Sequence, residues 1–219
     1  SVMITFSNIP RAVKLNGKYL EYGQDTYLLL SYRVYESKVE IFDGNTLIDS
    51  VEYTIDDNGN YSKTPDQDFL FEANGTNTAV KNTLPVTSLV ITKIWNDNDN
   101  IYGARPADGD QWITRFIIQR KTDNGEWENL KDDSGNDKIV ELRGTDKEKK
   151  QSLTVNDLPM KDYILDANKS YQLVTYQYRA RELQANATDT GVNNSNVIES
   201  NKGTFNGTYE VAYDDTIAG

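Results

Sequence analysis

Three ionisable side chains of this sequence occupy alternate positions in apolar stretches, and alternate side chains of a β-strand share one face. The positions that would share a face with Glu182 are apolar: Tyr176, Tyr178 and Ala180. The positions that would share a face with Asp215 are apolar as well: Val211, Tyr213 and Ile217. We therefore expect both carboxyl groups to point into a core, whereas Asp214 should face solvent.

Lys93 is the third of these residues, and it would share a face with Leu89, Ile91 and Trp95. The opposite face is also fairly apolar, so the sequence leaves the choice of core face open. If Lys93 points inward, charged groups without partners would be costly there. Burial lowers the pKa of a lysine and raises that of a carboxyl group, so both can become neutral near neutral pH. A neutral amine is a nucleophile and a neutral glutamic acid shuttles protons, so such a set can form an amide within the protein.

A second, partial set lies earlier in the chain. Glu36 follows Tyr32 and Val34 at alternate positions, opposite Arg33. The positions that share a face with Asn82 are Val80 and Leu84. Strand periodicity therefore predicts that Glu36 and Asn82 also point into a core.

Strands must position all of these residues, because the 219-residue chain alternates nearly everywhere and shows little helical spacing. Its 14 tyrosines and its many Val, Ile and Thr residues also favour strands. Expected strands include Val2–Ser7, Thr26–Ser37, Ser88–Trp95, Trp112–Lys121, Ser170–Gln184 and Thr208–Thr216. Turn sequences such as Asp43-Gly44-Asn45 separate them. This pattern predicts an all-β protein built of β-sandwiches.

The chain is expected to contain two such domains, residues 1–85 and 86–219. A proline interrupts the pattern at Leu84-Pro85-Val86-Thr87. An internal repeat supports this boundary, since Tyr32–Glu36 reads like Tyr178–Glu182. The first unit matches only the later part of the second, so we expect it to be incomplete at its N-terminus.

Composition excludes several function classes. The chain has no cysteine and no histidine, which rules out disulfides, thiol nucleophiles, Ser-His-Asp triads and zinc sites with Cys or His ligands. The net charge of −11 makes nucleic acid and anionic membranes poor partners. The stretch Asn96–Asn100 resembles a calcium loop but lacks the glycine and the distal glutamate of an EF-hand. We therefore expect no cofactor and no metal.

The sequence resembles the Cna B-type (CnaB) domains of Gram-positive surface adhesins and pilins. The resemblance covers most of residues 86–219 and part of residues 1–85. It rests on Val90–Asp97, Arg105-Pro106, Phe116–Lys121, the turn Asp123–Trp127, Leu158-Pro159 and Tyr178–Glu182. It implies tandem immunoglobulin-like sandwiches, the first one incomplete.

The resemblance also implies a spontaneous isopeptide bond, with Lys93 as the amine, Asp215 as the acceptor and Glu182 as the proton-shuttling acid. Asp215 departs from the commoner asparagine, so water would leave instead of ammonia. In the first unit Asn82 would be the acceptor and Glu36 the acid, with the lysine partner upstream of Ser1 and so not in the chain.

The function that this implies is structural. The chain would be a force-bearing stalk module of a cell-wall-anchored adhesin or pilus subunit, outside the bacterial cell and adjoining further modules. An alternative is a module that binds a host matrix protein or glycan through the loops Asn96–Gln111, Gly144–Lys150 and Ala185–Gly203. We expect no turnover enzyme, because the inward carboxylates are already explained by the crosslink.

Overall fold

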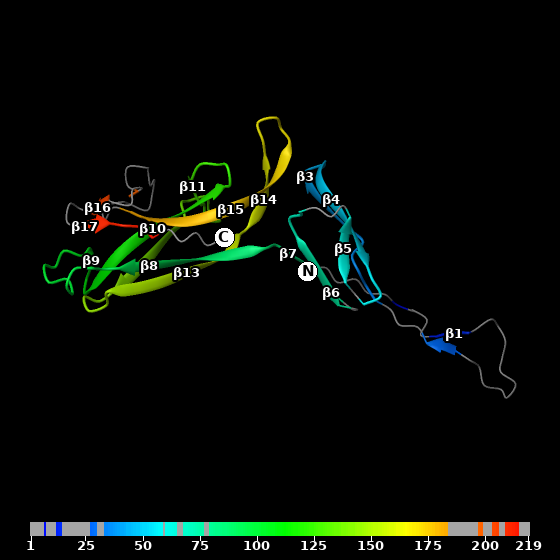
Figure 1. The fold of residues 1–219 in the computed structure, drawn as a ribbon, viewed down its shortest axis with the longest axis horizontal. Coiled ribbons are helices and arrows are strands. Elements are labelled where there is room, and N and C mark those ends of the chain that lie inside the picture. The colour runs from blue at the N-terminus through cyan, green and yellow to red at the C-terminus, as the bar shows by residue number, and fades with distance from the viewer. Residues whose placement is uncertain are drawn as a thin grey trace. The chain divides into compact units, whose positions relative to one another are not determined.

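The computed structural model describes Ser7 and residues 12–14, 27–29, 33–58, 60–64, 68–76, 79–183, 197–198, 203–205 and 209–214. Within these ranges the protein contains no helix and every strand pairing is antiparallel, which confirms the all-β prediction (Figure 1). Contacts divide the chain into two compact units. The first comprises Ser1–Asp68 and Glu72–Thr83, and the second comprises Phe69–Phe71 and Leu84–Gly219.

The described residues of the first unit form three small antiparallel sheets. Their strands are β1 (Ala12–Lys14) with β2 (Tyr27–Leu29), β3 (Lys38–Asp43) with β4 (Thr46–Ile55) and β5 (Tyr61–Thr64), and β6 (Glu72–Thr76) with β7 (Ala79–Thr83). The hairpin between β3 and β4 turns at Gly44, whose φ of 58° suits glycine. Val51 and Tyr53 alternate on β4 as its buried residues. Period-2 alternation therefore holds on this strand.

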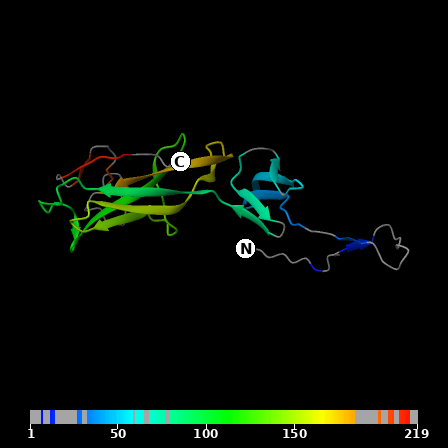
Figure 2. The same cartoon turned by 60° about the horizontal axis from the view of Figure 1, so that its bottom comes forward.

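In the described part of the second unit two sheets face each other, an arrangement consistent with a β-sandwich (Figure 2). The smaller pairs β8 (Val86–Ile94) with β13 (Lys150–Pro159). The larger contains β9 (Ala107–Asp108), β10 (Gln111–Thr122), β11 (Glu128–Asn129), β12 (Ile139–Gly144), β14 (Lys161–Leu165) and β15 (Tyr171–Glu182). A separate pair consists of β16 (Gly203–Phe205) and β17 (Tyr209–Val211).

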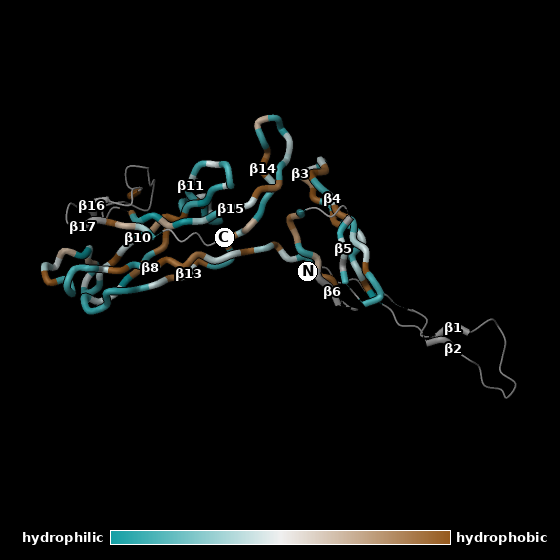
Figure 3. The backbone as a smooth tube through the Cα atoms, in the orientation of Figure 1, coloured by the Kyte–Doolittle hydropathy of each residue, from teal (hydrophilic) through white to brown (hydrophobic). Residues whose placement is uncertain are grey.

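The main core lies between these two sheets. Both sheets contribute buried side chains: Leu89, Ile91, Trp112, Phe116, Ile118, Leu142, Val155, Leu158, Tyr176 and Tyr178. Apolar segments follow β8 and β10 in Figure 3, as alternation into such a core requires. A register shift between Val155 and Leu158, with Asp157 at a φ of 57°, lets both of these residues reach the core.

Trp112 is the largest fully buried side chain and fixes one end of this core. Its indole N–H donates to the carbonyl oxygens of Thr145 and Glu148, at 3.0 and 3.1 Å. The ring packs directly on Gly144, where an added Cβ would lie 2.7 Å from Trp112 Cζ2. Only a residue without a side chain fits this position.

Replacing Gly144 with alanine is therefore expected to destabilise the protein by about 1–3 kcal/mol, because the indole must shift within a packed core. Urea unfolding of the full chain would measure this. In a Trp112→Phe background the same change should cost less, since phenylalanine lacks Cζ2, the atom nearest to the new methyl group. Equal costs in the two backgrounds would contradict this packing account.

Candidate functional site

The core face of β8 carries Lys93. Leu89, Ile91 and Trp95 are buried on this face, whereas the opposite face is exposed at Val90, Thr92 and Ile94. The choice of face that the sequence left open is thus resolved in favour of an inward Lys93. The pairing of β8 with β13 sets this orientation, with Lys93 opposite Gln151.

Glu182 ends β15 on the same side as Tyr176 and Tyr178, as its alternation predicts, and only 1% of it is exposed. In the ladder it lies opposite Phe116 of β10. The other face of β15 is not simply solvated, because Arg181 is also buried there. The guanidinium of Arg181 lies 4.4 Å from the centre of the Tyr213 ring.

The structure brings Lys93 and Glu182 together, although they are 89 residues apart in the sequence. Lys93 Nζ donates to Glu182 Oε2 at 2.8 Å and to Oε1 at 3.1 Å. The two side chains are 11% and 2% exposed. Burial raises the pKa of the Glu182 carboxyl group, and the charge and hydrogen bond of Lys93 oppose that rise. A carboxylate with a raised pKa accepts a proton from an amine at a smaller free-energy cost.

A pH dependence follows from the raised pKa of Glu182. Its stabilising effect is fully present below the unfolded value of 4.5 and is lost as the pH rises through the folded pKa. In a Lys93→Met variant the opposing charge is gone, so the shift should be larger. Urea unfolding at pH values from about 7 to about 4.5 should then show stabilisation relative to a Lys93→Met/Glu182→Gln double variant. Parallel pH profiles of the two variants would contradict the buried position of Glu182.

Asp215, the expected acceptor, lies outside the described residues. The preceding residues of the same segment are described, and Val211 is buried while Asp214 is exposed, as the alternation predicts. Tyr213 reaches the end of β15, where its hydroxyl oxygen accepts the Glu182 backbone N–H at 3.0 Å. The same hydroxyl group donates to the carbonyl oxygen of Ile198 at 2.7 Å.

The expected set in the first unit is not assembled. Asn82 is exposed on β7, so the expectation that it faces the core is wrong; β7 pairs only with β6 among the described strands. Glu36 precedes β3 outside any strand and is half-buried. Its Oε2 atom is buried and has no hydrogen-bond partner among the described residues. It lies near Tyr53, whose pKa is raised by burial and by the Glu36 charge.

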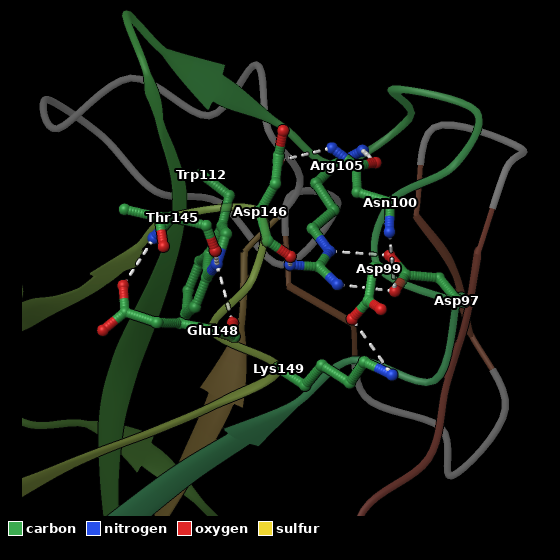
Figure 4. Close-up of polar contacts among 9 residues, drawn as sticks. All are labelled: Asp97, Asp99, Asn100, Arg105, Trp112, Thr145, Asp146, Glu148 and Lys149. Atoms are coloured by element: carbon green, nitrogen blue, oxygen red, sulfur yellow. Dashed lines mark hydrogen bonds and ion pairs between the residues drawn. The ribbon is translucent and has the colours of Figure 1, made fainter.

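The loop after β8 contains a buried ion pair that sequence reasoning missed. Arg105 donates from Nε and Nη2 to the two carboxylate oxygens of Asp97, both at 2.6 Å (Figure 4). Its Nη1 atom donates to the Asp146 carbonyl oxygen at 3.0 Å. Asn100 accepts a hydrogen bond from the Arg105 backbone N–H and donates one to the Asp146 carboxylate. The signal in the sequence was the Arg105-Pro106 pair, which served only as a marker of the resemblance and was not assigned a partner.

This ion pair also bears on the calcium-like stretch. The carboxylate of Asp97 is engaged by a guanidinium, and Asn98, Asp99 and Asn100 form a left-handed turn with φ between 53° and 61°. Asn and Asp tolerate this conformation better than other side chains. Among the described residues, no group of three or more Asp or Glu side chains is arranged to hold a metal ion.

No helix in the described part of the chain is long and apolar enough to span a membrane. Comparisons of the chain with protein-family models, with curated proteins and with solved structures find no match.

Proposed function

We propose that this chain is a structural stalk segment of a Gram-positive cell-surface adhesin or pilus subunit, composed of tandem CnaB-type sandwiches. Its second unit would be locked by a self-formed isopeptide bond between Lys93 and Asp215. The observation that carries the proposal is the buried contact of 2.8 Å between Lys93 Nζ and Glu182 Oε2. A lysine and a glutamate so deeply buried need a reason, because a buried ion pair is weak as a stabilising device.

The chemistry would proceed in two proton transfers. Glu182 takes a proton from the Lys93 ammonium and passes it to the Asp215 carboxylate, so that both reacting groups become neutral. The amine attacks Asp215 Cγ and forms the C–N bond. A second Nζ proton then moves through Glu182 to the departing hydroxyl group. The C–O bond breaks, one water leaves, and Glu182 returns to its starting state.

The position of Tyr213 supports Asp215 as the acceptor. Tyr213 is hydrogen-bonded to the Glu182 backbone, and Asp215 follows two residues later. The bond would join β8 to the last segment of the chain. A pulling force applied to both ends of the second unit would then load a covalent bond rather than a ladder of hydrogen bonds.

Single-molecule pulling tests this function directly. When the full chain is held at its two ends, the residues between Lys93 and Asp215 should not extend, because the crosslink excludes them from the stretched path. A Glu182→Ala variant should release that length as one additional unfolding step. Release of the same length in the wild-type chain would reject the stalk proposal.

A second candidate function is recognition of a host protein or glycan by a loop. The loop between Asp97 and Arg105 exposes Ile101 and Tyr102, at 63% and 90%. Its backbone is held by the buried ion pair and the left-handed turn, and a preordered loop loses less entropy on binding. Saturable binding on an array of host matrix proteins and glycans that Tyr102→Ser abolishes would support it. Binding unchanged by Tyr102→Ser would exclude this loop.

A further inference from the structure

The Trp95 indole ring contacts two cations and a second aromatic ring. Lys93 Nζ lies 4.2 Å from the ring centre, and Arg105 Cζ lies 5.4 Å from it. The Trp112 ring meets it edge to face, with centres 5.7 Å apart and planes at 74°. Trp95 itself is only 3% exposed. The face of an aromatic ring is electronegative, and its attraction for a cation grows when water is excluded.

The Trp95 ring packs against Arg105 and Trp112, and each of these side chains is held by hydrogen bonds of its own. Arg105 is completely buried in its side chain and is held by both oxygens of Asp97. Figure 4 shows the Asp97–Arg105 pair together with Trp112. The indole N–H of Trp112 donates to two backbone carbonyl oxygens in the loop after β12. A rotation of the Trp95 ring would give up its contacts with the Arg105 guanidinium and with the edge of Trp112.

The backbone of Lys93 does not by itself fix the position of the side-chain amine. Its amine ends a flexible four-carbon chain, which must be held in one geometry for a reaction to occur. Among the residues that the structure describes, the carboxylate of Glu182 and the face of Trp95 hold the amine in its position. Lys93 and Trp95 share a face of the same segment, so the ring is placed beside the amine by the strand itself.

We infer that Trp95 is a positioning residue for the Lys93 amine, and that the Asp97–Arg105 pair acts through Trp95 by holding its ring. Trp95 neither gives nor takes a proton. The ring face keeps the amine beside Glu182. The consequence for bond formation rests on the proposed function, whereas the consequence for the Lys93–Glu182 contact does not.

Fluorinated tryptophan at position 95 separates this role from simple core filling. Fluorine withdraws charge from the ring face and changes the shape of the side chain little. If Trp95 positions the amine, the rate of bond formation after dilution from denaturant should fall with each added fluorine, by roughly tenfold overall. Intact mass against time would measure this rate. The same substitution at Trp127, whose ring contacts Lys121 and Arg179, serves as the matched control and should leave the rate unchanged.

A second readout does not require the bond. In an Asp215→Ala background the Lys93 amine stays free, and NMR of the Glu182 carboxyl carbon reports the pKa of that group. Fluorination of Trp95 should raise this pKa, because Lys93 lowers it and would be held less closely. Loosening of the core would instead admit water and bring the pKa down toward its ordinary value.

The outcomes remain distinct. If the wild-type chain has its full mass, the proposed function is rejected. The pKa of Glu182 then still decides whether Trp95 positions the Lys93 amine. An unchanged or lowered pKa of Glu182 overturns the positioning role, even where the bond forms. A rate that falls only for Trp95 fluorination, together with a raised pKa, supports it.

Discussion

The Glu182→Ala variant should show the full mass calculated from its sequence, whereas the wild type should be short by one water. It should also lose more stability than the other single variants proposed for this chain. Two effects add in the same direction. Loss of a crosslink that closes a loop of this length removes about 4–5 kcal/mol on a chain-entropy account. The buried Lys93 ammonium would also lose the Glu182 carboxylate that accepts its hydrogen bonds, which lowers stability further. Intact mass reports whether the bond forms, and urea unfolding of the full chain measures the combined loss of stability.

Two control variants separate the chemistry from the packing around Glu182. Glu182→Gln keeps the shape and one acceptor oxygen but cannot carry the proton, so it should show the full mass with a smaller loss of stability. Glu141→Ala removes a carboxylate that pairs with Arg143 at the surface, and should behave like the wild type in mass and within about 1 kcal/mol in stability. If Glu182→Ala still lost one water, Glu182 would have no part in the reaction.

Replacing Arg105 with alanine should be the next most destabilising change, at about 3–5 kcal/mol. The Asp97 carboxylate, only 8% exposed, would lose the guanidinium that holds both of its oxygens. The Asp146 carbonyl oxygen and the Trp95 ring would lose a contact as well. Urea unfolding of the full chain, monitored by tryptophan fluorescence, measures this loss.

The stability contribution of the Asp97–Arg105 pair can be compared with that of two apolar side chains at the same positions. An Arg105→Met/Asp97→Leu double variant removes both charges, and should recover much of the stability that Arg105→Ala loses. Arg143→Ala removes a partly exposed guanidinium that pairs with Asp108 and Glu141, so it should cost only about 0–1 kcal/mol. Equal costs for Arg105→Ala and Arg143→Ala would show that burial does not govern the Asp97–Arg105 pair.

Period-2 alternation predicted the inward position of Glu182, and it grouped Lys93 with Leu89, Ile91 and Trp95 on one face of a long strand. It could not choose between the two faces around Lys93, since both are apolar in sequence; pairing with β13 and the opposing sheet make that choice. For Asn82 the same alternation was wrong. The short strand β7 has only β6 beside it among the described strands, and periodicity does not say whether anything covers a face.

The positions of Glu36 and of the Asp97–Arg105 pair could not be predicted, because they depend on strand pairing and on loop backbone conformation. The expected strand Thr26–Ser37 is paired only at Tyr27–Leu29 within the described residues, and Glu36 lies outside any strand. The Asp97–Arg105 pair depends on the backbone of the loop between them, with its left-handed turn at Asn98–Asn100. A charge pattern alone does not show that a loop folds back and buries its own ion pair. The tandem CnaB organisation stays a prediction.

Tandem mass spectrometry of the digested full chain tests the central claim most directly. The account predicts an intact mass short by one water, and a branched peptide in which Lys93 Nζ is joined to the side chain of Asp215. A full-mass protein with unmodified Lys93 and Asp215 peptides would contradict it, as would a branched peptide joining Lys93 to Glu182.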